Sequence, residues 1–285
     1  MRMKTTVVIT AIAALVGLAL PVQVAAQRPG AASRYTPARD AKDLKAVLFN
    51  WFWYMGMLRG PQEIEAVATL EHKATGTIQA SGQPCPLTSY RVSTNYQVPG
   101  QRVQYTCRLA NGQEYKAIEV VSGQYAWDED VVGAELRPGY GKAMPKPAAL
   151  HERLIRLWAS PQGAPKAAAA GGDKTTVSHD TGKPVVTFPI PGVPGAIAKA
   201  TLNSQNMTER VEVRQGEVVT DFTYTDYADH NNPLNKIDAF YAGKLVEQRN
   251  GVVMRDLTTT ETETGNVYVV MPVPASVRTA AATQR

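Results

Sequence analysis

Apolar and polar residues alternate along the chain from residue 90, and this period of two constrains the fold more than any other feature. One face carries Tyr90, Val92, Thr94, Tyr96 and Val98. After Pro99-Gly100 the alternation continues, and Asn111-Gly112 is a strong signal for a second hairpin turn. A meander with one apolar and one polar face indicates an antiparallel sheet that is covered on one side only.

Helical spacing precedes and follows this meander. Thr36-Pro37 is typical of a helix start, and a short second helix is predicted over 61–67. A later helix opens at Pro147, and an Ala-rich run covers 167–170. Strands then return, roughly at 184–190, 196–202, 209–214, 217–227, 236–247, 252–262 and 266–271. The order predicts an α+β fold: one large, curved, mostly antiparallel sheet, an open half-barrel, with helices packed on its concave face.

The first 26 residues have the three parts of a cleavable signal peptide. Arg2 and Lys4 precede an apolar stretch, and small residues end it at Ala26, so the mature chain should begin at Gln27. The alternative is an N-terminal membrane anchor, which an apolar run interrupted by glycine and proline disfavours. We therefore expect a periplasmic or secreted protein, soluble after cleavage, with a single domain over 27–278 and a disordered tail over 279–285.

The chain has two cysteines, Cys85 and Cys107. In an oxidising compartment an even pair predicts one disulfide, and two free buried thiols are the alternative. A simple hairpin at Pro99-Gly100 would place Cys107 opposite about residue 92. Cys85 would then have to curl back over the sheet to reach its partner.

Composition excludes several classes of function. The formal charge of +5 falls to +3 without Arg2 and Lys4, and basic residues are scattered, so nucleic-acid binding is disfavoured. No phosphate-binding glycine loop and no GxSxG elbow occur. The sequence predicts no cofactor and no metal site.

A few polar clusters admit a catalytic interpretation beside an ordinary one. Asp226, Asp229 and His230 form the only acidic cluster with a histidine, which we interpret as a polar turn. The acidic run 128–130 follows Trp127 and is interpreted as a strand-end loop rather than a glycosidase site.

The aromatic cluster at 51–54 is the least ordinary segment. Trp51 and Met55 fit an inward helical stripe, whereas Trp53 and Met57 are predicted to point elsewhere, toward a partner, a membrane surface or a lipid-filled cavity. The alternative is a helix buried on two sides. Methionine and tryptophan together suit an adaptable apolar surface.

This order of elements resembles the LolA-like half-barrel superfamily of periplasmic lipoprotein carriers and lipid-binding proteins. A nearer likeness is to uncharacterised exported bacterial proteins, and it rests on three segments: residues 156–163 (RLWASPQG) with Lys166-Ala167, residues 223–227 (TYTDY), and residues 272–274 (PVP). Some similar proteins continue into a metallo-β-lactamase-type hydrolase domain, but the HxHxDH motif of that domain is absent from this sequence. The resemblance implies a hydrophobic cavity and brings no catalytic motif.

The leading hypothesis is an exported binding or carrier protein for a lipid or other apolar ligand. The residues predicted to line its cavity are Trp51, Met55, Trp127, Leu154, Trp158, Phe222 and Tyr224; alternatively, they are ordinary core. A non-enzymatic envelope scaffold or sensor that binds a protein partner is the second hypothesis. A hydrolase with a site assembled from distant residues, around His179 or His230, is the third.

Overall fold

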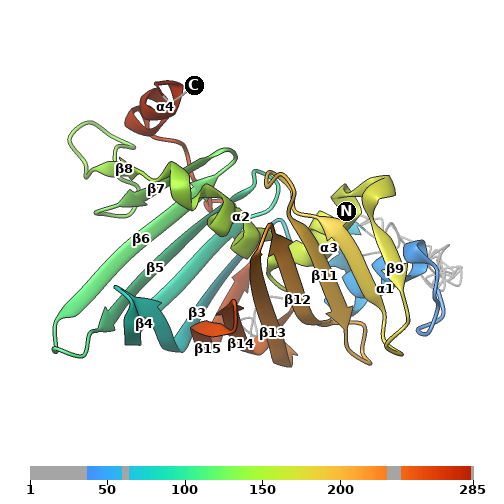
Figure 1. Ribbon diagram of the computed structural model, residues 1–285. Coiled ribbons are helices and arrows are strands. Elements are labelled where there is room, and N and C mark those ends of the chain that lie inside the picture. Colours follow the sequence, from blue (N-terminus) through green and yellow to red (C-terminus); the bar gives the residue numbers. More distant parts are fainter. Residues whose placement is uncertain (1–36, 60–63, 230–238, 284–285) are drawn as a thin grey trace, which may run out of the picture.

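A computed structural model describes residues 37–59, 64–229 and 239–283. Its main feature is one antiparallel sheet with the strand order β8-β7-β6-β5-β4-β3-β15-β14-β13-β12-β11-β10-β9 (Figure 1). The first half of the sheet contains β3 (Thr69–Ala80), β4 (Gln83–Asn95), β5 (Gly100–Arg108), β6 (Glu114–Ser122), β7 (Tyr125–Glu129) and β8 (Ala143–Pro145). The second half contains β9 (Thr176–Ser178), β10 (Val185–Pro189), β11 (Ile197–Leu202), β12 (Thr208–Gln215), β13 (Val218–Asp229), β14 (Phe240–Arg249) and β15 (Val252–Thr264). A separate two-stranded ribbon joins β1 (Leu58–Arg59) to β2 (Ile64–Glu65).

The two halves join where β3 pairs with β15, so strands from both ends of the chain lie side by side. Gly76 makes this join possible. Its φ of +133° is a conformation that residues with a side chain rarely adopt, and a Cβ there would lie 2.1 Å from the carbonyl oxygen of Asp256. The predicted single sheet is therefore confirmed.

The helices are α1 (Leu44–Tyr54), α2 (Leu150–Ala159), α3 (Gly163–Ala170) and α4 (Ala275–Ala282), with short 3₁₀ turns at Pro147–Ala149 and Gly172–Lys174. The ten residues of α2 span about 15 Å. They contact β5, β6 and β7 in one half of the sheet and β12 in the other. Because β5 and β12 are six strands apart, about 29 Å across a flat sheet, the sheet must curve around α2. The predicted open, curved sheet with a helix in its hollow is confirmed (Figure 1).

Two predictions about the N-terminal helices are wrong. The first helix begins at Leu44, where the Asp43 side chain accepts a hydrogen bond from the backbone N–H of Ala46 at 3.0 Å. Asp43 is thus the N-cap, rather than Thr36, which lies outside the described residues. Part of the helix predicted over 61–67 is instead the strand Ile64–Glu65, because this segment pairs with Leu58–Arg59 in a hairpin.

The disulfide between Cys85 and Cys107 is confirmed, but the predicted register is wrong. Asn95 pairs with Gly100, so the turn takes up residues 96–99, and a bulge between Leu87 and Ser89 shifts β4 by one further residue. Cys107 therefore lies opposite Leu87, two residues from Cys85 and on the same face. No curling back of the segment around Cys85 is needed.

Three clusters of buried side chains form the core. The largest lies between α1, α2, α3 and the second half of the sheet. A second surrounds the disulfide, and a third lies under α4. A disordered tail was predicted from residue 279, whereas 275–282 form α4. Its alanines favour a helix, and Val277 packs into the third cluster.

Candidate functional site

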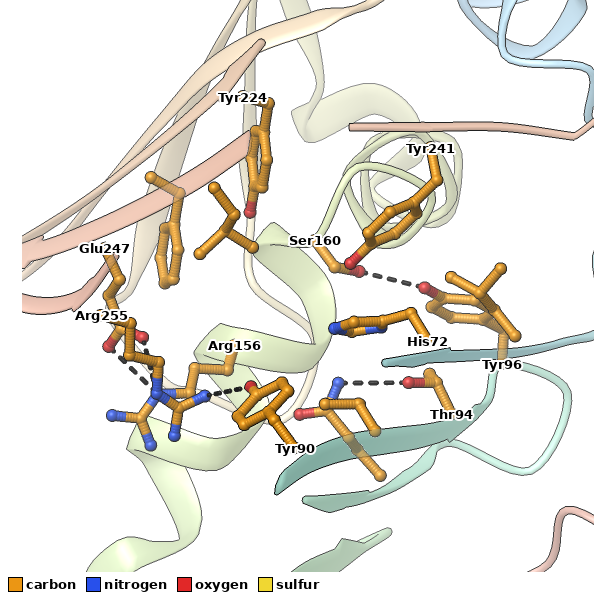
Figure 2. Close-up of a pocket in the computed structure, with 15 residues that line it drawn as sticks. His72, Tyr90, Thr94, Tyr96, Arg156, Ser160, Tyr224, Tyr241, Glu247 and Arg255 are labelled. Atoms are coloured by element: carbon orange, nitrogen blue, oxygen red, sulfur yellow. Dashed lines mark hydrogen bonds and ion pairs between the residues drawn. The ribbon is translucent and has the colours of Figure 1, made fainter. Parts of the chain in front are cut away.

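A cavity opens in the middle of the sheet, at the join between its halves (Figure 2). It holds about 450 Å³ of empty space, counted out to its opening to solvent. Strands β3, β4, β5, β13, β14 and β15 and the end of α2 contribute its walls: Leu70, His72, Tyr90, Val92, Thr94, Tyr96, Gln101, Arg156, Ser160, Phe222, Tyr224, Tyr241, Leu245, Glu247 and Arg255. The part of this space that water-sized molecules can occupy is about 40 Å³, enough for a few ordered waters and below the range for preformed small-molecule pockets.

A buried ion cluster closes one end of the cavity. Glu247 is only 1 % exposed, and both of its carboxylate oxygens accept hydrogen bonds from Nε of Arg156 at 3.0 Å. Nε of Arg255 lies 3.4 Å from the same carboxylate. Burial alone would raise the pKa of Glu247, but the two guanidinium charges lower it below its ordinary value. Glu247 therefore stays ionised between the two arginines.

Further carboxylates complete this ion cluster. Glu119 lies 3.8 Å from Arg156 and 3.6 Å from Arg255. Glu152 lies 2.5 Å from Arg156 and 2.8 Å from Arg249. The charges of these arginines are thus matched by carboxylates within the cluster.

Tyrosines and aliphatic residues form the rest of the wall, and most of their polar atoms are already bonded. The hydroxyl of Tyr224 donates to the carbonyl oxygen of Ala159 at 2.8 Å. The hydroxyls of Tyr96 and Ser160 lie 3.1 Å apart, and Tyr90 accepts a hydrogen bond from Arg255 at 3.3 Å. These internal bonds fix the rings and leave their apolar surfaces toward the cavity.

His72 is the exception among the polar residues of the wall. Its ring is buried, and its centroid lies 4.9 Å from that of Tyr241 and 6.0 Å from that of Tyr90. Nδ1 of His72 is buried and has no hydrogen-bond partner among the described residues. Burial, reinforced by the charge of Arg255, lowers the pKa of His72 to about 3. The imidazole is therefore neutral at physiological pH.

Two of the seven predicted ligand-binding residues, Phe222 and Tyr224, line the cavity. The next four are buried in the largest core cluster with them: Trp51, Met55, Leu154 and Trp158. Trp158 lies one layer behind the wall, with its ring 6.5 Å from that of Tyr96. Trp127 lies in the third cluster, away from the others.

The structure also places the remaining candidates. Trp53 is 46 % exposed and stacks on Phe49, whereas Met57 is fully buried, as in the alternative of burial on a second side, and faces neither a partner nor a membrane surface. Met57 turns inward because its backbone N–H bonds back to the carbonyl of Phe52, beyond the end of α1. His179 approaches the backbone carbonyl of Lys42 at 3.1 Å. His230 lies outside the described residues.

The acidic run at 128–130 belongs to structural contacts. Glu129 is buried, pairs with Arg102 at 3.1 Å and accepts a hydrogen bond from the indole of Trp127. Asp128 pairs with Arg153 at 2.5 Å. The interpretation as a solvated loop is thus wrong for Glu129, whose carboxylate ties β7 to β5.

The segment 156–163 forms the corner between α2 and α3 and supplies two cavity residues, Arg156 and Ser160. The hydroxyl of Ser160 accepts from the backbone N–H of Gly163 at 3.1 Å. Gln162 is fully buried and donates to the carbonyl oxygen of Phe240 at 2.6 Å. The segment 223–227 supplies Tyr224, so two of the three segments noted in the sequence meet at the cavity.

Sequence reasoning missed most of the polar residues of the site, namely His72, Tyr241, Glu247 and Arg255. Besides Phe222 and Tyr224, the apolar face that carries Tyr90, Val92, Thr94 and Tyr96 was recognised from the sequence, and these four residues line the cavity. The signal that could have marked the missed residues is a polar or charged side chain within an otherwise apolar alternation. It becomes interpretable only when the strand partners are known.

The search with protein-family models found no match, and no curated protein matched. Among solved structures, the chain is similar to a LolA superfamily protein from Nitrosomonas europaea, with 12 % identity, a TM-score of 0.41, and coverage of 80 % of this chain and 96 % of the other. It is also similar to a DUF1329 family protein from Desulfovibrio piger, with 7 % identity, a TM-score of 0.39, and coverage of 81 % and 96 %.

The described residues, 37–59, 64–229 and 239–283, were compared with what a membrane span and a metal site require. None of the helices in this part of the chain is long and apolar enough to cross a bilayer. Among the same residues, no group of three or more histidine, cysteine or acidic side chains is arranged to hold a metal ion.

Proposed function

We propose that this protein binds a lipid or another small molecule with an apolar body in the cavity at the centre of its sheet. The observation that carries the proposal is a hollow inside a curved sheet, walled by Leu70, Val92, Phe222 and Leu245 together with tyrosine rings. A pocket with an apolar wall and a few convergent polar groups is the usual form of a small-molecule site. Burial of the ligand's apolar surface would supply most of the binding free energy.

We further propose that the protein works as a carrier or binding protein in the periplasm, or after secretion. The signal peptide predicted over 1–26 supports this location, although that segment lies outside the described residues. The disulfide between Cys85 and Cys107 supports it independently, because disulfides persist in oxidising compartments. The ion cluster and the internal hydrogen bonds support a binding role by fixing the polar end of the cavity before a ligand arrives, whereas an apolar chain larger than the void would have to part the walls.

The first test is native mass spectrometry, with organic extraction, on the 27–285 protein purified gently from an envelope fraction. A lipid at near-stoichiometric amount is the expected result. In parallel, the apo protein is titrated with N-phenylnaphthylamine, a neutral apolar dye that fluoresces when it leaves water. One saturable site is expected.

A matched pair of variants locates the site. Leu245→Trp adds bulk at the cavity wall and should weaken dye binding about tenfold or more, whereas Val253→Trp introduces the same side chain at a position that is 42 % exposed and should leave binding unchanged. Absence of both a co-purified lipid and dye binding would refute the proposed function. Equal dye affinity of the two variants would show that the dye binds elsewhere on the protein.

A further inference from the structure

We infer that the ligand of this cavity carries an uncharged hydroxyl-bearing head group, which hydrogen-bonds with His72 and Tyr241. The inference rests on the proposed function and adds to it the chemical class of the ligand. It sets an uncharged amphiphile, such as a long-chain alcohol, apart from a fatty acid or a cationic amphiphile.

The charged end of the cavity offers no uncompensated charge to a ligand. Arg156 and Arg255 share the carboxylate of Glu247 and lie within 4 Å of Glu119. An anionic head group would have to displace a carboxylate that is already held at 3.0 Å, or else lie beside it without a counter-charge. Burying an unpaired ion in such a place is very unfavourable. A cationic head group would likewise find no free carboxylate, because Glu247 and Glu119 are already paired with Arg156 and Arg255.

Among the described residues, Nδ1 of His72 is the one buried polar atom of the wall without a hydrogen-bond partner, and the hydroxyl of Tyr241 lies in the same wall. Figure 2 shows no hydrogen bond from either of them to any other residue drawn. Their ring centroids are 4.9 Å apart, and both side chains line the cavity. By contrast, the polar ends of Tyr96, Ser160 and Tyr224 are engaged with one another or with the backbone. A buried polar atom without a partner is unfavourable, so a ligand that satisfies it gains binding free energy.

A hydroxyl group fits both partners. Neutral imidazole has one nitrogen that donates and one that accepts, and a tyrosine hydroxyl does either. An alcohol oxygen can donate and accept at once, so it suits either tautomer of His72. The depressed pKa of His72 is consistent with this, because a neutral ring offers no charge to a carboxylate.

The test compares amphiphiles with the same ten-carbon chain as competitors of N-phenylnaphthylamine: decanol, decanoate and decyltrimethylammonium. We expect decanol to displace the dye at a concentration at least about tenfold lower than either ion requires. Equal displacement by all three would overturn the inference and leave the proposed function standing. Displacement of the dye by decanoate at a lower concentration than decanol requires would also overturn the inference. Failure of dye binding itself would refute the proposed function and, with it, the inference.

Two variants then assign the contact. His72→Phe and Tyr241→Phe each keep a ring and remove the polar atom, and each should weaken decanol about fivefold more than it weakens the dye. Tyr125→Phe, which removes a hydroxyl outside the cavity, is the control and should change neither value. If His72→Phe does not fold, Tyr241→Phe alone decides. Unchanged decanol affinity in the variants that fold would overturn the assignment of these residues.

Discussion

Glu247 should be one of the most sensitive single positions in the protein, because its carboxylate is buried between two guanidinium groups. In Glu247→Gln the side chain keeps its size and loses its charge. Nε of Arg156 then faces a neutral amide, and Arg255, 3.4 Å from the carboxylate in the structure, loses its closest charged partner. The variant therefore leaves two buried positive charges without their central counter-charge.

The magnitude follows from burial. Removing one partner of a buried ion pair costs about 3–5 kcal/mol, because the remaining charge cannot return to water. Glu119 stays within 3.6 and 3.8 Å of the two arginines and offsets part of that loss. We therefore expect the free energy of unfolding to fall by about 3 kcal/mol, the lower end of the range.

The assay is urea unfolding at neutral pH, monitored by circular dichroism, with Glu261→Gln as the matched control. Glu261 pairs with Lys73 at 2.8 Å, but its side chain is 56 % exposed, so its loss should cost less than about 0.5 kcal/mol. A loss below about 1 kcal/mol for Glu247→Gln, or one equal to that of the control, would refute the view that the cluster is electrostatically closed.

Three further predictions concern stability. Replacing Cys85 and Cys107 by serine or alanine should lower the free energy of unfolding by about 3 kcal/mol, because the disulfide closes a loop with a sequence separation of 22; thermal unfolding of the oxidised, reduced and substituted proteins checks this. Because the pKa of His72 is lowered to about 3, the folded state binds fewer protons than the unfolded state below pH 6. The free energy of unfolding should therefore fall by about 1.4 kcal/mol per pH unit as the pH drops from about 6 toward 3. In urea unfolding at a series of pH values, His72→Phe should remove this component of the slope. Gly163→Ala would place a Cβ 2.2 Å from the carbonyl oxygen of Leu157, and we expect a loss of about 2 kcal/mol in the same urea assay; no loss would show that the corner between α2 and α3 relaxes freely.

The architecture was predictable because it depends on periodicity that each strand carries in its own sequence. The inward face of β4, with Tyr90 and Val92, is visible as an alternation, and hairpin signals such as Asn111-Gly112 order the neighbours. The same periodicity predicts that β3 and β15 belong to one sheet, but it does not predict that they are neighbours. Which strands meet there depends on closing a long connection, and no local pattern specifies it.

The register errors have a common physical cause. The position of Cys107 depended on the turn length after Asn95 and on the bulge near Leu87, and each of these shifts the pairing by a residue or more. The path of the chain just past α1, which buries Met57, depends likewise on tertiary contacts. The backbone carbonyl of Met55, just past the helix, accepts a hydrogen bond from the N–H of Phe240, which belongs to a distant strand. Local propensity contains no information about such partners.

The site was hidden for a different reason, which also indicates why it matters. Tyr241, Glu247 and Arg255 place polar or charged groups on the inward face of strands whose neighbours Leu245 and Leu257 are apolar. A well-packed apolar core at the same place would often be as stable or more stable than a buried ion cluster. Polar and charged side chains at the inward positions of strands depart from the usual apolar pattern. Such a departure, beside a histidine whose Nδ1 has no partner among the described residues, is expected at functional positions rather than at purely structural ones. The end of the sheet around Trp127 also contains a buried ion pair, Glu129 with Arg102, and the oxygens of Glu129 are bonded there by Arg102, Trp127 and Gly133. The centre combines buried charges with a cavity and with a histidine nitrogen that has no partner among the described residues. For that reason we place the proposed binding at the centre rather than at the aromatic residues that the sequence displays most openly.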